Sequence, residues 1–534
     1  MHRRDFIGHV GAAAGLLIFN KANTGNAHAS TSASLSSSNS MRLFIPPDAD
    51  NETLASIALE TARSKGATYA DIRINRYKNQ YISTREEKLL SVSDWEDFGF
   101  GIRVIVGGAW GFASSSEVTK EEVTRIVGEA VAIAKANAVL QKSPVQLAPT
   151  PSYKDKWSTP IQINPFDVPV QEKVDLLLSV NREALKAKGA KYCYSALFQT
   201  NEHKFFASSE GSIIEQDTYR IWPSFNVTAV SDDGMDFQSR GGYCMPIGRG
   251  YEYCKEYPLL DDARQAGEDA VAKLKAPSIE PGKRDLILMP SHLWLVIHES
   301  CAHATELDRA LGFEANFAGT SFITPDMLNK LQYGSSVVNI VGDRTEKYGL
   351  ATVGYDDEGV KAMRFNIIKN GLFVGYQTIR EQAHWVGDKE SHACAYADSY
   401  GHMPMQRMPN VSLQPGEKHL TPDDLIAGID DGVLIKGDGS WSIDQQRRNF
   451  QFGGQAFYEI KHGKITGMLR DVAFQAMTLD FWNSCDAVCS KEFYELGGSY
   501  YCGKAQPEQV APVSHGSSPA RFRNINFINT KRKV

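Results

Sequence analysis

The sequence predicts an α+β protein, in which an N-terminal α/β domain is followed by a C-terminal domain dominated by antiparallel β-sheet. Three observations lead to this fold class. Helical and strand-like patterns alternate before Pro281, and short strand patterns between Gly turns fill most of the chain after Gly312. Between Ser291 and Gly312, an apolar helical pattern contains two histidines and a glutamate. At 534 residues, the chain is long enough for two or three domains.

Composition and charge exclude several classes of protein. The chain has 42% hydrophobic and 22% charged residues, which is typical of a globular protein. A net charge of -6 without a basic patch gives no reason to expect nucleic acid as a partner. No apolar run reaches the roughly 18 residues of a membrane helix, so we expect no membrane insertion.

These patterns divide the chain into five parts. We expect a signal peptide, a Ser-rich disordered linker, two α/β segments that pack together, and the C-terminal domain. The expected boundaries are 1–29 for the signal peptide, 30–47 for the linker, 48–140 for the N-terminal α/β domain, 150–280 for the middle α/β segment and 283–530 for the C-terminal domain.

The first 29 residues carry the pattern of an export signal. Arg3 and Arg4 form a twin-arginine pair, a mildly hydrophobic stretch follows, and Ala27-His28-Ala29 has the small-x-small pattern of a cleavage site. The alternative is an uncleaved amphipathic tail. Because the twin-arginine route carries folded proteins, we expect a periplasmic protein of a bacterium that acquires any metal before export.

Hydrophobic periodicity predicts the elements of the two α/β segments. Thr119 and Glu122 form a capping box that predicts one helix start, and Pro169 predicts another. In chain order we expect a helix at 54–61, strands at 72–74 and 102–106 with a turn at 107–108, a helix from 119, a connector at 142–160, a helix from 169, strands over 191–230, a loop at 243–257, a helix at 259–274 and a domain junction at 277–281.

The helix expected after Ser291 contains the pattern H-E-x-x-x-H, formed by His298, Glu299 and His303. Ser291 is expected to cap the start of this helix and Gly312 to end it. Imidazole nitrogen suits zinc, and a neighbouring glutamate that is not a ligand can accept a proton from water. The helix is therefore a candidate metal site.

The spacing of the two histidines constrains the geometry of this helix. They lie five positions apart, which is about 140° around an ideal α-helix, so a regular helix cannot direct both at one ion. A π-bulge or a broken turn between Glu299 and His303 would bring them together. Two alternatives stay open: two unrelated histidines, or a hydrogen-bonded stripe of Glu299, His303 and Glu306 without a metal.

Short strands and tight turns are expected after the histidine helix. Asn370-Gly371 predicts a hairpin between strands at 362–368 and 372–377, and His462-Gly463 predicts another between 457–461 and 464–469.

An acidic run, Asp356-Asp357-Glu358 before Gly359, could suggest metal ligands. Three acids before a glycine are more often a solvated turn, and we expect that here.

Eight cysteines are distributed along the chain, and an exported protein can form disulfides. Cys485 and Cys489 lie four positions apart, a spacing that rarely suits a disulfide. A redox role for this pair is an alternative function, although no C-x-x-C motif supports it. Cys301 lies inside the histidine motif, where its position favours a packed small residue. The others are Cys193, Cys244, Cys254, Cys394 and Cys502.

The stretch HESCAHATELD resembles the active-site helix of the TldD/PmbA family of metallopeptidases, in which H-E-x-x-x-H is followed by Glu and Asp, here Glu306 and Asp308. Further stretches resemble the N-terminal and C-terminal domains of that family. They are Gly66–Arg73, Gly99–Ser115, Asp356–Gly359, Ser399–Asn410, Phe452–Gly467 and Tyr501–Gly516. Inactive partners in this family lack the His/Glu motif, so the resemblance implies an active subunit.

The resemblance also implies a site. It implies zinc held by His298, His303 and Cys502, with Glu299 as the general base. Cys502 could instead be a buried inert cysteine, and His402 is the second candidate for the third ligand. Residues from one matched stretch are candidates for binding substrate or the transition-state oxyanion: Tyr400, His402 and Arg407. Three other histidines carry no comparable signal: His384, His392 and His515.

Partners and substrates are likewise implied by the resemblance. It implies a homodimer, or a heterodimer with a PmbA-like subunit, that encloses a cavity in which short or unstructured peptides are cleaved. Extended peptides commonly bind by adding a strand to a sheet edge. The alternatives are a non-catalytic TldE/PmbA-like partner or peptide-binding subunit, and a zinc amidohydrolase that acts on a non-peptide amide.

Overall fold

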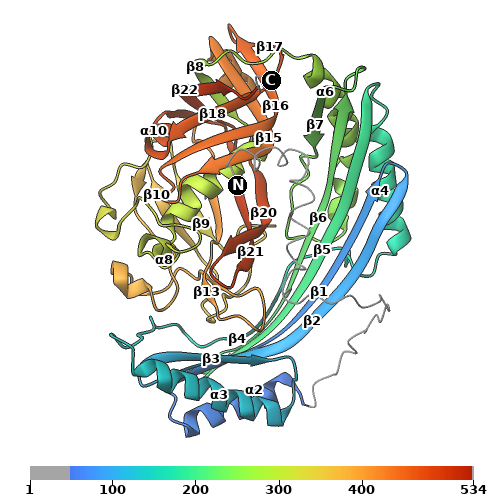
Figure 1. Ribbon diagram of the computed structural model, residues 1–534. Helices are drawn as coiled ribbons and strands as arrows, with labels where there is room; N and C mark the ends of the chain where they lie inside the picture. The colour runs from blue at the N-terminus through green and yellow to red at the C-terminus, as the bar shows by residue number, and fades with distance from the viewer. Residues whose placement is uncertain (1–48, 532–534) are drawn as a thin grey trace, which may run out of the picture. The chain divides into compact units, whose positions relative to one another are not determined.

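The computed structural model describes residues 49–531 and confirms the predicted α+β class (Figure 1). Two large sheets of mostly antiparallel strands carry the helices. The expected signal peptide (1–29) and linker (30–47) lie outside the described residues. Among the described helices, none is long and apolar enough to cross a membrane.

The first sheet contains seven strands in the order β3-β2-β1-β5-β6-β4, with β7 paired to β6. All neighbours are antiparallel except β4 and β6. The central strands are 17 to 19 residues long, and the pairing of β1 with β5 makes one sheet from both α/β segments. The strands are β1 (Tyr69–Arg85), β2 (Lys88–Val106), β3 (Ala109–Ser115), β4 (Lys154–Ser158), β5 (Ala190–Ser208), β6 (Ile213–Val230) and β7 (Phe237–Gly241).

Four helices cover this sheet. α2 (Asn51–Ser64) and α3 (Lys120–Ala138) pack at the end formed by β1, β2 and β3, as Figure 1 shows. α4 (Val170–Ala184) and α6 (Leu259–Lys275) pack on β5 and β6. Thr119 caps α3, since its hydroxyl accepts from the backbone N–H of Glu122, which is one half of the predicted capping box; the Glu122 carboxylate pairs with Arg125. A short helix, α5 (Glu252–Glu256), lies in the stretch expected to be a loop.

The second large sheet forms the centre of the C-terminal domain. Its order is β15-β8-β22-β18-β16-β17, with β19 beside β22, and a further pairing of β15 with β16 closes the sheet on itself. The strands and flanking helices are β8 (Gly282–Leu288), α9 (Pro422–Ala427), β15 (Asp431–Ile443), β16 (Asn449–Lys461), β17 (Lys464–Leu469), β18 (Val472–Met477), α10 (Thr478–Asn483), β19 (Cys485–Val488) and β22 (Ala520–Asn529).

Both predicted hairpins are confirmed. Asn370 and Gly371 join β10 to β11, and His462 and Gly463 join β16 to β17, all four with positive φ as a type I′ turn requires. Three smaller sheets complete the domain. They contain β9 (Ile340–Asp343), β10 (Arg364–Lys369), β11 (Leu372–Phe373) and β14 (Asn410–Leu413); β12 (Ala395–Tyr396) and β13 (Met405–Gln406); and β20 (Glu495–Lys504) and β21 (Gln509–Ser517).

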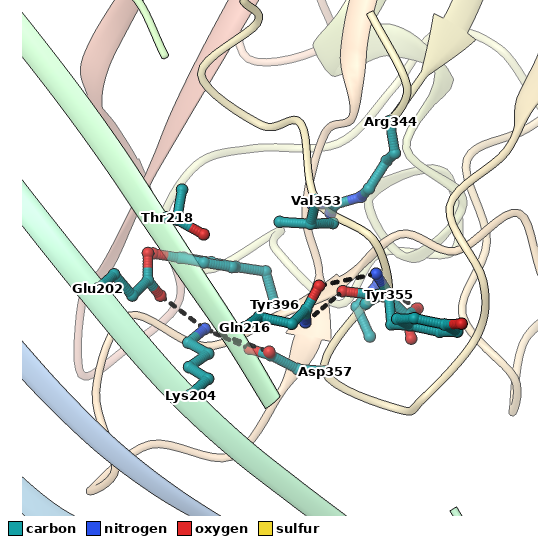
Figure 2. A pocket seen from close by; sticks show the side chains of 11 residues that line it. Glu202, Lys204, Gln216, Thr218, Arg344, Val353, Tyr355, Asp357 and Tyr396 are labelled. Atoms are coloured by element: carbon teal, nitrogen blue, oxygen red, sulfur yellow. Dashed lines mark hydrogen bonds and ion pairs between the residues drawn. The ribbon is translucent and has the colours of Figure 1, made fainter. Parts of the chain in front are cut away.

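The acidic run before Gly359 is not the solvated turn that we expected. Asp356, Asp357 and Glu358 are all buried at the junction with the first sheet. Figure 2 shows Asp357 facing Lys204 of β5, whose ammonium lies 2.8 Å from the carboxylate, and Lys204 in turn faces Glu202. Glu358 pairs with a buried arginine of β2 at 3.1 Å. A cavity of about 10 Å³ at this junction has room for about one water molecule.

Glu202→Gln is expected to lower the free energy of unfolding by about 3–5 kcal/mol, because it leaves Arg220 buried without its carboxylate partner and Lys204 paired with Asp357 alone. Burial alone would raise the pKa of Glu202, but the two cations outweigh it and hold the pKa at about 2, against 4.5 for an ordinary glutamate. The stability due to this pairing is therefore present above pH 4.5 and is lost as the pH falls toward 2.

Denaturant unfolding at pH 7 and pH 3 checks this prediction, with Glu117→Gln at an exposed position as the control. The difference between wild type and Glu202→Gln should shrink at pH 3. An equal difference at both pH values would contradict the assignment.

Candidate metal centre

The segment that carries the histidine motif departs from α-helical geometry, as the five-residue spacing predicts. It consists of α7 (Pro290–Val296), a π turn (Ile297–Ala302), a 3-10 turn (His303–Thr305) and α8 (Leu307–Ala310). In the π turn, the N–H of His303 donates to the carbonyl of His298, so residues five apart lie on one face. The two imidazole rings are both buried, with centroids 4.6 Å apart, so neither histidine lies outside the core.

The ends of this segment differ in part from the prediction. Met289 occupies the N-cap position of α7, with Pro290 as the first helical residue, so the expected cap by Ser291 is wrong. The Ser291 hydroxyl instead accepts from the N–H of Gly437 at 3.1 Å and anchors the helix to β15. Gly312 has a φ of 86° and ends the segment as expected.

Side chains from other elements satisfy the carbonyls that the irregular turns leave free. The Tyr333 hydroxyl donates to the carbonyl of Ser300, and the Gln377 amide donates to that of Ala302 at 2.6 Å. Within the segment itself, the Thr305 hydroxyl donates to the carbonyl of Cys301 at 2.9 Å. Tertiary contacts therefore stabilise the distortion that brings the histidines together.

The π turn places His298 and His303 beside Cys502 of β20. One ligand atom from each of the three residues lies within 4.8 Å of the others, and the Cys502 Sγ lies 3.7 Å from the His303 Nε2. Two ligands of one tetrahedral zinc, with bonds of about 2.3 Å to sulfur and 2.0 Å to nitrogen, lie about 3.6 Å apart. All three side chains are buried, and each is about 5% exposed. The donor set and its spacing therefore fit zinc with one coordination position left free.

Burial shapes the protonation of these three groups. It lowers the pKa of His298 and of His303, so both imidazoles stay neutral, which is the form that binds a metal. Burial raises the pKa of the Cys502 thiol, and the Arg407 guanidinium opposes this shift. All eight cysteines are free, so Cys502 is available as a ligand, and Cys485 and Cys489 form no disulfide.

Behind His298 lies His515 of β21, one of the three histidines without a sequence signal comparable to that of the motif. The His515 Nδ1 lies 2.8 Å from the Val411 carbonyl, which can only accept, so this nitrogen carries the proton. The His515 Nε2 then accepts from the His298 Nδ1 at 2.7 Å. This chain leaves the His298 Nε2 unprotonated, with its lone pair available to a metal.

Behind His303 lies Glu306, whose carboxylate is 2.8 Å from the His303 Nδ1. Lys504, two residues after Cys502, pairs with Glu306 at 3.2 Å and with Asp308 at 2.8 Å. The hydrogen bond between the His303 Nδ1 and Glu306 fixes the imidazole ring with its Nε2 toward Cys502. The alternative of a hydrogen-bonded stripe of Glu299, His303 and Glu306 is found only in part, because His303 and Glu306 are in contact.

Glu299 turns away from that stripe. It forms an ion pair with Arg447, which lies in the turn between β15 and β16. After burial, the charge of Glu299 also affects the pKa values of His298 and Cys502, so this carboxylate lies near the ligand group, where Arg447 holds it.

The other predicted site residues have different surroundings. His402 lies 2.6 Å from a carboxylate oxygen of Asp398, and its backbone carbonyl accepts from Arg73 of the first sheet. Tyr400 packs close to Gly99 and Gly101 of β2. Arg407 is buried and donates to the carbonyls of Cys502 and Gln509, so it supports the backbone of the ligand strand. The ring of His392 stacks on Phe365, and that of His384 lies edge-on to Trp385.

Three residues of the site were missed by sequence reasoning: His515, Lys504 and Arg447. Lys504 lies in the matched stretch after Cys502, so its position offered a signal. His515 is also in a matched stretch, but its pairing with the histidine helix depends on β21 lying beside α7. Arg447 lies in a polar turn with no distinguishing pattern.

The fold and the site together define a candidate metalloprotein of the α+β class, with a buried His-His-Cys centre and the Glu299 carboxylate near it. Three protein ligands drawn from His and Cys, with a fourth position left open, follow the general pattern of catalytic zinc sites.

Comparison with known proteins gives the family. Residues 281–529 match the PmbA/TldA metallopeptidase C-terminal domain, residues 70–134 match domain 1 and residues 163–276 match the central domain. These matches extend over most of the chain, which therefore belongs to the TldD/PmbA family of metallopeptidases.

The names of curated relatives agree with this assignment, and a solved structure shares the fold. A metalloprotease of Methanocaldococcus jannaschii is 29% identical over 458 residues, which cover 85% of this chain and 95% of the relative. A zinc metalloprotease TldD homolog of Saccharolobus solfataricus is 25% identical, with 88% and 98% covered. The structure of TldE from Thermococcus kodakarensis shares the fold, with a TM-score of 0.68, 16% identity, and 88% and 98% of the chains covered.

Proposed function

We propose that this protein is a zinc-dependent peptidase that hydrolyses short or unstructured peptides. The observation that carries the proposal is the π turn, which brings His298 and His303 together with Cys502 and contains Glu299 directly after His298. The names of the curated relatives, metalloprotease and zinc metalloprotease, support it.

In this proposal His298, His303 and Cys502 hold the ion. When bound, zinc supplies Lewis acidity, which lowers the pKa of a coordinated water to about 7 and polarises the substrate carbonyl. Glu299 accepts the proton of the attacking water as its oxygen bonds to the carbonyl carbon. Glu299 then passes that proton to the amine nitrogen, which leaves with the electrons of the broken C–N bond.

Burial of the site supports small or extended substrates. The three ligand side chains and Glu299 are each about 5% exposed, so a folded protein could not present a peptide bond to them. We propose that the active form is a dimer enclosing the site, either a homodimer or a heterodimer with a PmbA-like subunit. The fold shared with TldE supports such a partner.

The experiment is metal analysis and peptide cleavage with the purified chain, before and after treatment with a chelator. We expect about one zinc per chain and cleavage of an unstructured peptide that zinc restores after chelation. Zinc binding without any cleavage would favour a non-catalytic peptide-binding subunit. Cleavage confined to non-peptide amides would favour an amidohydrolase.

We also propose that the protein is exported folded to the periplasm by the twin-arginine route, with Arg3 and Arg4 as the signal and Ala27-His28-Ala29 as the cleavage site. Replacement of both arginines by lysine should keep the precursor in the cytoplasm, as cell fractionation would show. The matched control is a reporter protein without cysteines, fused behind residues 1–29. It shows whether this segment alone directs export. Unchanged periplasmic delivery would contradict this proposal.

A further inference from the structure

Arg447 lies in a turn that holds it in a conformation unusual for a side-chain-bearing residue. Its φ is 65°, a region that favours glycine, and such residues cluster at functional sites. The Asp444 carboxylate fixes the turn by accepting from the N–H groups of Gln446, Arg448 and Asn449. The Thr478 hydroxyl donates to the Arg447 carbonyl at 2.6 Å. Hydrogen bonds from Asp444 and Thr478 therefore hold the backbone of this turn in place.

The same turn is linked by hydrogen bonds to the segment 290–310, which carries the histidine motif. The N–H of Thr320 donates to the Gln445 carbonyl at 2.9 Å, and that of Phe322 donates to the Gln446 carbonyl at 2.8 Å. Between them, the Ser321 hydroxyl donates to the Ala304 carbonyl, directly after His303. Arg447 is thus attached to the candidate metal centre through backbone contacts as well as through Glu299.

The side chain of Arg447 points inward although its neighbours in the turn are exposed. It is 11% exposed, and its one carboxylate partner among the described residues is Glu299. Its Nη2 also lies 3.4 Å from the Ala318 carbonyl, and its buried Nε has no hydrogen-bond partner among the described residues. The Nε–H of the guanidinium therefore has no hydrogen-bond acceptor among the described residues. Glu299 is the single described carboxylate that forms an ion pair with it.

The charge on that carboxylate changes in the proposed reaction. When Glu299 takes a proton from water, Arg447 loses its anionic partner inside a buried site, where an unpaired charge is costly. In the same step, the carbonyl oxygen of the substrate becomes negatively charged. A cation that loses one anion as another forms beside it stabilises the transition state more than the ground state.

We propose that Arg447 is a catalytic residue whose guanidinium holds Glu299 in the resting site and then binds an anionic oxygen of the substrate. This inference rests on the proposed peptidase function. The anionic oxygen is that of the scissile carbonyl or that of the terminal carboxylate of the peptide, and both have the chemistry that a guanidinium recognises.

Arg447→Gly is the sharpest variant, because glycine adopts a φ of 65° without strain and the turn should persist. The adjacent Arg448→Gly is the matched control at an exposed position. Both variants and wild type are assayed on one peptide sequence with a free C-terminal carboxylate and with a C-terminal amide. Zinc content and thermal unfolding are measured on the same samples.

We expect Arg447→Gly to keep its zinc and a cooperative unfolding transition, with a lower melting temperature because Glu299 loses its buried partner, but to lose about 10²–10³ in kcat on both peptides, the effect of removing one oxyanion donor. Arg448→Gly should match wild type. Millimolar guanidinium ion should partly restore kcat to Arg447→Gly, which a purely structural role would not allow. A loss confined to KM on the free-carboxylate peptide would instead assign the terminal carboxylate as the bound oxygen.

A second readout does not depend on turnover. Calorimetric binding of a phosphinic peptide, whose tetrahedral anionic group resembles the oxyanion, should weaken about 10²-fold in Arg447→Gly and remain unchanged in Arg448→Gly. If wild type cleaves peptide and Arg447→Gly equals it in kcat, KM and phosphinic peptide affinity, the role of Arg447 is refuted while the peptidase function stands. If wild type with zinc cleaves no peptide but still shows the Arg447-dependent affinity, the peptidase function fails and the anion site stands.

Discussion

Glu299→Gln is expected to keep the fold and about one zinc per chain while peptide hydrolysis falls by about 10²–10⁴-fold, the usual worth of general-base assistance. Glutamine has nearly the same shape as glutamate and can still accept a hydrogen bond from Arg447, so packing around the π turn should persist. It cannot accept a proton from water. The loss should therefore appear in kcat, with zinc content unchanged by metal analysis.

The matched controls separate a base from a ligand. Glu417→Gln, at an exposed position of the same domain, should leave activity unchanged. His298→Ala should lose both zinc and activity, because it removes a ligand. Loss of zinc in Glu299→Gln would make Glu299 a ligand. Full activity of Glu299→Gln on an unstructured peptide would refute the proposed mechanism and favour the non-catalytic or amidohydrolase alternative.

Cys502→Ser is expected to bind zinc far more weakly and to lose most peptidase activity, since a serine hydroxyl does not replace a thiolate as a zinc ligand. The substitution keeps the size of the side chain, so β20 and β21 should remain paired. Competition with a chromophoric chelator measures the affinity. In the cobalt-substituted protein, the thiolate-to-cobalt absorption band of wild type should be absent from the variant.

Cys301→Ser provides the control for this experiment. Cys301 lies in the same π turn and is fully buried, but it is not part of the ligand group. It should keep the zinc affinity and the cobalt band of wild type, whatever the change costs in stability. Wild-type zinc affinity in Cys502→Ser would contradict the ligand set and would return His402 to consideration, despite its contact with Asp398.

Much of the fold could be predicted because short-range patterns record local geometry. The helix expected at 259–274 corresponds to α6, and the Asn-Gly and His-Gly pairs mark real hairpins, because few residues adopt the positive φ that these turns need. Strand lengths were underestimated: β1 and β2 extend far beyond 72–74 and 102–106. Neither strand alternates throughout: β2 is exposed on both faces over most of 88–97, and most residues of β1 are buried whichever face they lie on.

The acidic run shows where local patterns mislead. Asp357 and Glu358 are buried because Lys204 and Arg103 neutralise them, and these partners lie 153 and 255 residues away in the chain. A sequence window cannot contain such partners, so the more frequent outcome, a solvated turn, was expected and was wrong.

By itself, the sequence determined that His298 and His303 can share a metal only on a distorted helix, because helical pitch is a local property of the backbone. It also determined the hairpin positions, and resemblance to a family indicated Cys502. Only the tertiary structure decided that His515 orients His298, that Lys504 supports Glu306, and that Arg447 holds Glu299. These partners lie 217, 198 and 148 residues from the groups they contact, and long-range side-chain pairing depends on how the strands between them pack.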